Sequence, residues 1–372
     1  MLIGRPNVGK SNILEALGLF SLPYFKYNKS KKITQFVRLE NIAELFFDGD
    51  IEKEISIRAD DNSSCIVKYL DRLFIQKEKF VSFRIESTQD TIKKIIPVMV
   101  DEQLNLGIND HGFSEKEIEE IKNKVIEIEE KFNSGIELSL EDNRTMIQWK
   151  KIGRINTLHL DNKGLKKEKY LSQPKVKLYK FPYDFVFKKQ TIRHPYLIPP
   201  SGVNLLEAIQ EGKIERKLAK IFTDYGLQFV LNAANQSVQI QKNKGENLVF
   251  SIPFNSIADT LQRIIFFKTA IASNKNSILL FEEPEAHCFP PYIAHITQEI
   301  INSESNQFFI ATHSPYILND FLEYERDDVA IFMADFKDGQ TVIKRLTDSE
   351  LNDVYEYGID LFFNAELFTD EI

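Results

Sequence analysis

The chain has 372 residues, of which 43% are hydrophobic and 27% charged, and its formal net charge is -8 with an isoelectric point near 5.5. This composition is typical of a packed protein and excludes wholesale disorder, while the acidic balance argues against a protein that coats nucleic acid with its whole surface. Cys65 and Cys288 lack the paired spacing of a zinc site, and no long apolar run predicts a membrane span, so we expect a cytoplasmic protein without a membrane partner.

A phosphate-binding loop is predicted at the start of the chain. Residues 4–11 read Gly-Arg-Pro-Asn-Val-Gly-Lys-Ser, which fits the pattern G-x-x-x-x-G-K-[ST]. Backbone N–H groups of such a loop close around phosphate oxygens, and the helix expected over residues 12–20 adds positive potential at its N-terminus. Lys10 is predicted to reach the β- and γ-phosphates of ATP, and Ser11 to ligate Mg²⁺. The candidate nucleotide-binding residues are Gly4, Arg5, Pro6, Asn7, Val8, Gly9, Lys10, Ser11 and Asn12.

Two features of this loop leave alternatives open. Only residues 1–3 precede it as a short strand, so the contacts to the nucleotide base are not predicted. The loop also resembles the first motif of Era-type GTPases, in which Asn-Lys-x-Asp selects guanine. The two candidates for that second motif, residues 243–246 and 274–277, read Asn-Lys-Gly-Glu and Asn-Lys-Asn-Ser and lack the aspartate. The sequence therefore favours ATP over GTP.

The middle of the chain is marked by two blocks of opposite charge. Alternating hydrophobicity over residues 39–58 predicts strands around a turn at residues 48–50. Residues 101–142 then carry thirteen acidic residues against four lysines, with a helical pattern over 114–132. Residues 144–200 carry fourteen basic residues against three acidic ones, with interleaved aromatics. This basic block is a candidate nucleic-acid surface, or else it pairs internally with the acidic block.

These shifts in composition predict an α/β fold with a nucleotide-binding core that is interrupted once. Residues 1–100 are expected to form the first half of the core, residues 101–198 a mixed or helical insertion, and residues 199–372 the second half. In the second half, a helical pattern runs from the turn signal at residues 199–202 through Phe222, and short strands are expected around Phe229 and Val238.

Two buried strands near the C-terminal end carry candidate hydrolytic residues. Residues 277–283 read Ser-Ile-Leu-Leu-Phe-Glu-Glu, an apolar run that ends in two acids. Because successive strand residues face opposite sides, we assign Glu282 to Mg²⁺ and Glu283 to the attacking water. Residues 307–315 predict a second strand that ends at His313, whose imidazole is suited to sense the γ-phosphate.

The motifs at both strand ends resemble one known family. Residues 281–287, Phe-Glu-Glu-Pro-Glu-Ala-His, are followed about twenty-five residues later by Ala-Thr-His-Ser-Pro, and together they look like the OLD-type ABC ATPases, which are related to the SMC and RecF groups. The resemblance implies a P-loop NTPase fold with an ABC-type ATPase head, with Glu283 as the catalytic carboxylate and His313 as the switch histidine. Glu282 departs from most ABC-type proteins, which have aspartate there, so slow turnover is expected.

Residues 255–263 occupy the position in which this family has its ABC signature. The resemblance implies that Ser256 contacts the γ-phosphate held by a second subunit, so that ATP joins a homodimer or a higher homo-oligomer. The alternative is a plain capping box between Ser256 and Asp259, whose carboxylate would repel a phosphate unless it is turned away.

The expected role follows from what surrounds these motifs. About sixty residues follow His313, and they predict a closing hairpin over residues 330–346 and an acidic tail rather than the TOPRIM nuclease that OLD-type proteins often carry. The chain therefore resembles the stand-alone ATPase subunits of bacterial anti-phage systems of Septu or retron type, in which a separate effector protein such as a nuclease does the damage. This resemblance implies an ATP-gated sensor or scaffold, and a RecF-like DNA-repair ATPase is the alternative.

Overall fold

The computed structural model describes residues 1–27, 32–59, 64–70, 80–86, 127, 131, 139–142, 156–161, 164–169, 174–182, 194–211, 214–223, 225–232, 237–245 and 248–369. Contacts divide the chain into two compact units. The first unit contains Met1–Ser30, Thr34–Arg38 and Lys175–Ile372, and the second contains Lys31–Ile33 and Leu39–Pro174. The three segments predicted from composition have other bounds and stay a prediction.

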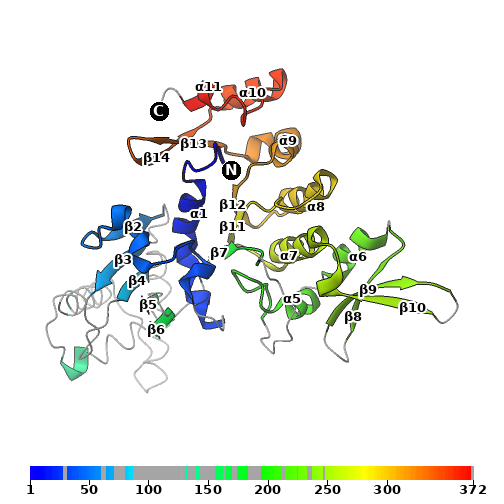
Figure 1. Ribbon diagram of the computed structural model, residues 1–372, viewed down its shortest axis with the longest axis horizontal. Coiled ribbons are helices and arrows are strands. Elements are labelled where there is room, and N and C mark those ends of the chain that lie inside the picture. The colour runs from blue at the N-terminus through cyan, green and yellow to red at the C-terminus, as the bar shows by residue number, and fades with distance from the viewer. Residues whose placement is uncertain are drawn as a thin grey trace, which may run out of the picture. The chain divides into compact units, whose positions relative to one another are not determined.

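A six-stranded sheet forms the centre of the first unit, in the order β14-β13-β1-β12-β11-β7 (Figure 1). Neighbouring strands are parallel except for the antiparallel pair β13 and β14. The strands are β1 (Leu2–Gly4), β7 (Val176–Tyr179), β11 (Ile278–Glu282), β12 (Gln307–Ala311), β13 (Phe332–Lys337) and β14 (Gln340–Arg345). The two strands predicted before Glu283 and His313 and the closing hairpin are confirmed, although β12 is buried only at Ile310 and Ala311.

Helices cover both faces of this sheet (Figure 1). On one face α1 (Lys10–Gly18) packs with Gly18 against Leu178, whose partner across the strands is Leu280. On the other face Leu279 and Phe281 share a core with α7 (Asp259–Ser273) and α8 (Pro290–Ile301). Because strand residues alternate, Glu282 points to the same face as Leu280, which is the face that α1 covers.

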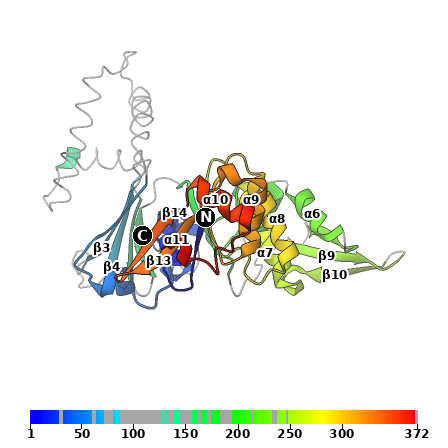
Figure 2. The same cartoon turned by 90° about the horizontal axis from the view of Figure 1, so that it is seen from above.

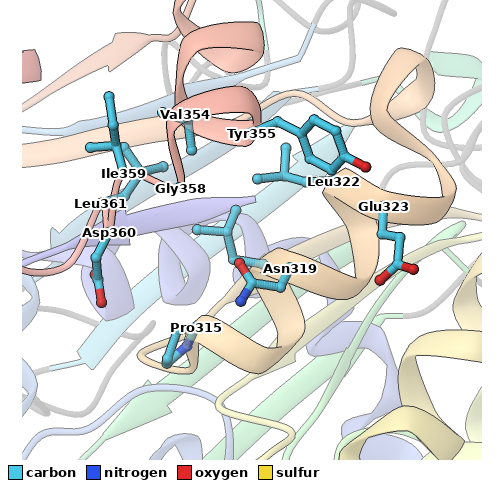
Figure 3. Close-up of a pocket in the computed structure, with 11 residues that line it drawn as sticks. Pro315, Asn319, Leu322, Glu323, Val354, Tyr355, Gly358, Ile359, Asp360 and Leu361 are labelled. Carbon is cyan, nitrogen blue, oxygen red and sulfur yellow. The ribbon is translucent and has the colours of Figure 1, made fainter.

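The C-terminal helices pack on the same face of the sheet as α7 and α8. Helices α9 (Pro315–Tyr324) and α10 (Asp348–Tyr357) pack with Ile3 and Met333 in one hydrophobic cluster, and the short helix α11 (Glu366–Thr369) lies against β13 (Figure 2). Between α9 and α10 there is a pocket of about 330 Å³ (Figure 3). Leu322 and Val354 line it together with Asn319 and Glu323.

The remaining part of the first unit precedes α7 in the chain. Besides the 3-10 helix Leu19–Tyr27, which follows α1, it includes α5 (Leu205–Glu211), α6 (Glu215–Thr223) and a three-stranded antiparallel sheet in the order β10-β9-β8. Its strands are β8 (Gln228–Asn232), β9 (Ser237–Asn243) and β10 (Val249–Pro253). The strands predicted around Phe229 and Val238 are confirmed, and the predicted helical stretch is divided between α5 and α6.

The second unit contains a five-stranded antiparallel sheet in the order β2-β3-β4-β5-β6. Its strands are β2 (Ile55–Arg58), β3 (Ser64–Leu70), β4 (Phe80–Glu86), β5 (Asn156–Asp161) and β6 (Gly164–Lys169). Of the predicted helix over residues 114–132, the structure describes only Glu127 and Lys131, and both are helical. Most of the acidic block and part of the basic block lie outside the described residues.

One predicted strand of this unit is wrong. Before the turn and within it, the chain forms 3-10 helices at Ile42–Leu45 and Phe47–Gly49. The side chains of Asn41 and Glu44 form a capping box, which satisfies backbone N–H groups at the start of the first of these helices and outweighs the alternating pattern. The predicted turn is present, with positive φ at Asp48 and Gly49.

None of the helices in the described part of the chain is long and apolar enough to cross a membrane.

Candidate active site

The phosphate-binding loop, Glu282, Glu283 and His313 come together because β1, β11 and β12 are parallel neighbours. Ala311 at the end of β12 pairs with Leu2 of β1 on one side and with Glu282 of β11 on the other. The carboxyl ends of these strands therefore form one edge of the sheet, where α/β proteins bind ligands. The phosphate-binding loop, Glu283 and His313 each follow one of these strand ends.

The backbone of the loop requires its glycines. Gly9 has a φ of 91° at the N-cap of α1, and a Cβ at this position would collide with the hydroxyl of Thr341 on β14. A Cβ on Gly4 would collide with the carbonyl oxygen of Ala334, the neighbouring residue on β13. Asn7 also has a positive φ, of 65°, which asparagine tolerates better than most residues.

Lys10 is buried beneath this loop. Its Nζ donates to the carbonyl oxygens of Gly4 at 2.8 Å and Arg5 at 2.7 Å, so the side chain folds back toward the start of the loop. Burial lowers the pKa of Lys10, and the Glu283 carboxylate acts in the opposite direction. Lys10 is thus the cation of a site that already contains the predicted catalytic acid.

The other loop residues differ in exposure. Val8 is buried, Ser11 is half-buried, and Pro6 and Asn12 are exposed at the surface. The exposed guanidinium of Arg5 forms an ion pair with Glu366 of α11. Pro6, Ser11 and Asn12 are thus at least partly open to solvent, as a loop that receives a phosphate chain requires.

Glu283 and His313 face each other across the two strand ends. Glu283 leaves β11 with a φ of 43°, and its N–H donates to the carbonyl of Ala311 at 2.8 Å. The Nε2 of His313 lies 3.8 Å from Oε1 of Glu283. The pKa of His313 is lowered by burial and by Lys10, while Glu283 raises it. Lys10, Glu283 and His313 therefore form one electrostatically coupled group.

Glu282 belongs to a network of four charges on the α1 face. Its Oε1 accepts from Arg38 at 2.6 Å, and its Oε2 lies 3.2 Å from Nζ of Lys180. The same two cations hold Glu15 of α1, at 3.2 Å and 2.7 Å respectively. Carboxylate and hydroxyl oxygens are ligands that Mg²⁺ prefers, so Ser11 and Glu282 suit the ion. Glu282 is already ion-paired with Arg38 and Lys180, and its predicted magnesium role stays a prediction.

Ser256 is exposed and does not cap a helix. It ends a short 3-10 helix, Phe254–Ser256, whereas α7 begins at Asp259 with Ala258 as an N-cap that lacks a side-chain hydrogen bond. The capping-box alternative is therefore wrong. Oδ2 of Asp259 accepts from Arg263 at 2.9 Å and lies 3.4 Å from His287, so its charge is partly compensated. A contact of Ser256 with a second subunit stays a prediction.

The sequence patterns missed some residues of the site. Glu15, Arg38 and Lys180 are far apart in sequence from Glu282, and no motif marks them. Glu285 lies within a recognised motif, but the pattern assigns it no role, and its Oε1 accepts from Thr312 at 2.6 Å. The polar Thr312, which directly follows β12, was the signal from which this contact could have been predicted.

Comparison with known proteins identifies a family. Residues 1–319 match the family described as "AAA domain, putative AbiEii toxin, Type IV TA system". No match is found among curated proteins.

Solved structures of SMC heads are among 59 matching chains. The SMC head bound to the C-winged helix domain of ScpA is 12% identical, with 93% of this chain and 89% of that chain covered and a TM-score of 0.43. The SMC head domain from Thermotoga maritima is 8% identical, with 93% and 89% covered and a TM-score of 0.34. The Smc head domain with a coiled coil and joint from Pyrococcus yayanosii is 12% identical, with 96% and 94% covered and a TM-score of 0.36.

Proposed function

The chain belongs to the AAA domain family whose model matches residues 1–319, and on this premise we propose that it binds ATP at residues 4–12 and hydrolyses it. The observation that carries the proposal is the meeting of Lys10, Glu283 and His313 at one edge of the sheet. The two hydrolytic candidates lie 3.8 Å apart, and Lys10 acts electrostatically on His313 and is itself influenced by Glu283.

In the proposed reaction, water attacks the γ-phosphorus of ATP and the bond to the bridging oxygen breaks, so that ADP leaves with that oxygen. The carboxylate of Glu283 accepts a proton from the attacking water. A lowered pKa keeps His313 neutral near neutral pH, and a neutral imidazole can both donate and accept, which suits it to bridge the water and a γ-phosphate oxygen. Lys10 compensates the charge of the β- and γ-phosphates.

Mg²⁺ would neutralise phosphate charge in this site when bound. We propose that Ser11 and Glu282 hold it. Because Arg38 and Lys180 occupy both oxygens of Glu282, the ion must share that carboxylate with them or displace one of them.

The substitution Lys10→Ala tests the nucleotide site. Hydrogen bonds to charged groups contribute about 1.5–3 kcal/mol each, so losing two of them, to the β- and γ-phosphates, should cost about 3 kcal/mol or more and weaken ATP binding at least about a hundredfold. Calorimetric titration of ATP measures the change, and Lys275→Ala, which removes an exposed lysine, is the matched control. Unchanged affinity in Lys10→Ala would contradict the assignment. Competition that favours GTP tenfold would support the GTPase alternative.

We further propose that the chain is an OLD-type, cytoplasmic ATPase that controls a separate effector in bacterial anti-phage defence. The motifs around Glu283 and His313 support the family assignment, and the family description, which names a toxin and a Type IV TA system, supports a role in such a system. The exposed Ser256 lies beside the start of α7, whose N-cap residue makes no side-chain hydrogen bond and whose acidic Asp259 is partly compensated by Arg263. This supports ATP-dependent association of two copies, because N–H groups at a helix N-terminus favour an anion.

Light scattering tests the association. The variant Glu283→Gln should retain ATP, and ATP should convert it from monomer to dimer, whereas adding Ser256→Glu should prevent this by repulsion. A monomer with and without nucleotide would remove Ser256 from the site. Purification of the native complex identifies the effector, and DNA recovered without an effector protein would favour the RecF-like alternative.

A further inference from the structure

The turn after β11 brings a third acidic side chain to the end of β12. Residues 283–288 form consecutive turns, in which the N–H of Ala286 donates to Glu283 at 3.0 Å and the N–H of Cys288 donates to Glu285 at 2.8 Å. The positive φ of Glu283 lies at the start of these turns. The side chain of Glu285 consequently reaches across to Thr312 and His313.

Glu285 fixes the residues around the switch histidine. Its Oε1 accepts from Oγ1 of Thr312 at 2.6 Å and from the N–H of His313 at 3.0 Å. Oγ1 of Thr312 in turn accepts from the N–H of Ser314 at 2.9 Å. The backbone N–H groups of His313 and Ser314 are thus held by one carboxylate and the buried hydroxyl to which it is bonded.

The Glu285 carboxylate lies in an environment that is energetically unfavourable for a charged group. Oε2 of Glu285 is buried and has no hydrogen-bond partner among the residues that the structure describes. Burial raises the pKa of Glu285, although its bonds to Thr312 and His313 act in the opposite direction. A buried oxygen without a partner is destabilising, so stability alone does not account for a glutamate here.

We infer that Glu285 is a positioning residue that holds the imidazole of His313 opposite Glu283. This inference rests on the proposed function. The two strand ends are joined by the N–H of Glu283, which donates to Ala311, and by Glu285, which accepts from Thr312 and from the N–H of His313. The gap of 3.8 Å between the two functional side chains is too long for a hydrogen bond and has to be kept at the right width for a third group.

Steady-state kinetics tests the inference. A misplacement of about 1 Å in a catalytic site costs up to about a hundredfold, so Glu285→Ala should lower kcat about 10- to 100-fold and change the dissociation constant of ATP less than about threefold. Glu285→Gln keeps an accepting oxygen and should lower kcat much less than Glu285→Ala. Glu304→Ala, which removes an exposed glutamate from the first unit, is the control and should retain full activity.

Thr312 provides a conservative pair for the same test. Thr312→Val keeps the shape and removes the hydroxyl, so it should lower kcat as Glu285→Ala does. Thr312→Ser keeps the hydroxyl and should retain most of the wild-type kcat. Equal effects of the two substitutions would overturn the inference.

A double-mutant cycle separates positioning from a general structural role. If Glu285 acts through the imidazole, Glu285→Ala should cost less than about threefold in kcat when it is added to His313→Ala. A full additional loss in that background would overturn the inference. If the wild type does not hydrolyse ATP, the proposed function has failed, and if His313→Ala and Glu283→Gln leave hydrolysis unchanged, the catalytic roles proposed for these two residues have failed. Both results are distinguishable from a failure of the role of Glu285.

Discussion

Glu299 on α8 allows a test of how the helices beside the site are held together. One oxygen of its carboxylate accepts from Lys268 of α7 at 2.9 Å and the other from Lys217 of α6. The side chains of Glu299 and Lys268 are only 11% and 10% exposed, whereas that of Lys217 is 57% exposed. Breaking a buried ion pair by removing one partner costs about 3–5 kcal/mol, while an exposed pair contributes at most about 1 kcal/mol.

We therefore expect Glu299→Gln to lower the free energy of unfolding by about 3 kcal/mol, because it leaves the ammonium of Lys268 buried without a counter-charge. Lys217→Gln is the matched control and should lower it by less than about 1 kcal/mol. Urea unfolding followed by circular dichroism measures both. If the two substitutions destabilise equally, the difference in burial does not decide the contribution of these ion pairs.

The sign of the pH dependence follows from the same contacts. Burial raises the pKa of Glu299, but the hydrogen bonds from Lys217 and Lys268 outweigh it, and the net pKa lies below its usual value of 4.5. A lowered carboxyl pKa contributes stability above the unfolded pKa, and this contribution is lost as the pH falls through the folded pKa. The stability difference between wild type and Glu299→Gln should therefore be constant near neutral pH and shrink below about pH 4.5.

Three further predictions concern the site. Gly9→Ala should weaken ATP binding at least about tenfold in a calorimetric titration, because its Cβ collides with a side chain of β14 and its φ of 91° disfavours alanine, and full binding would contradict this. The pKa of His313, followed by NMR titration, should lie below 6.5 and fall further in Glu283→Gln, because the Glu283 carboxylate raises it. A higher His313 pKa in Glu283→Gln would show that Glu283 does not act on His313 in this way. Arg38→Gln should lower the Mg²⁺ concentration for half-maximal hydrolysis if this arginine competes for Glu282, and a higher requirement would show that it does not.

Much of the core and of the site was predictable because it depends on local patterns. The apolar runs before Glu283 and His313 predict two neighbouring parallel strands, and parallel strands bring their carboxyl ends to one edge. The loop pattern likewise predicts the turn before α1, because Gly9 requires a left-handed backbone there.

The failures have physical reasons as well. Around Asn41, local capping outweighed an alternating pattern, so 3-10 helices replaced a strand. The charges that surround Glu282 come from Glu15, Arg38 and Lys180, and only the folded chain brings such distant positions together. The contacts of Glu285 depend on a positive φ at the preceding turn, which no periodicity indicates.

Phosphate release by wild type and Glu283→Gln, measured together with ATP affinity, tests the central claim most directly. Loss of a general base or a water-orienting group typically lowers the rate about 10²- to 10⁴-fold. We predict that Glu283→Gln binds ATP within about threefold of wild type and hydrolyses it at least about a hundredfold more slowly. Full turnover in this variant, with hydrolysis abolished by Glu282→Gln instead, would contradict the assignment of the two acids.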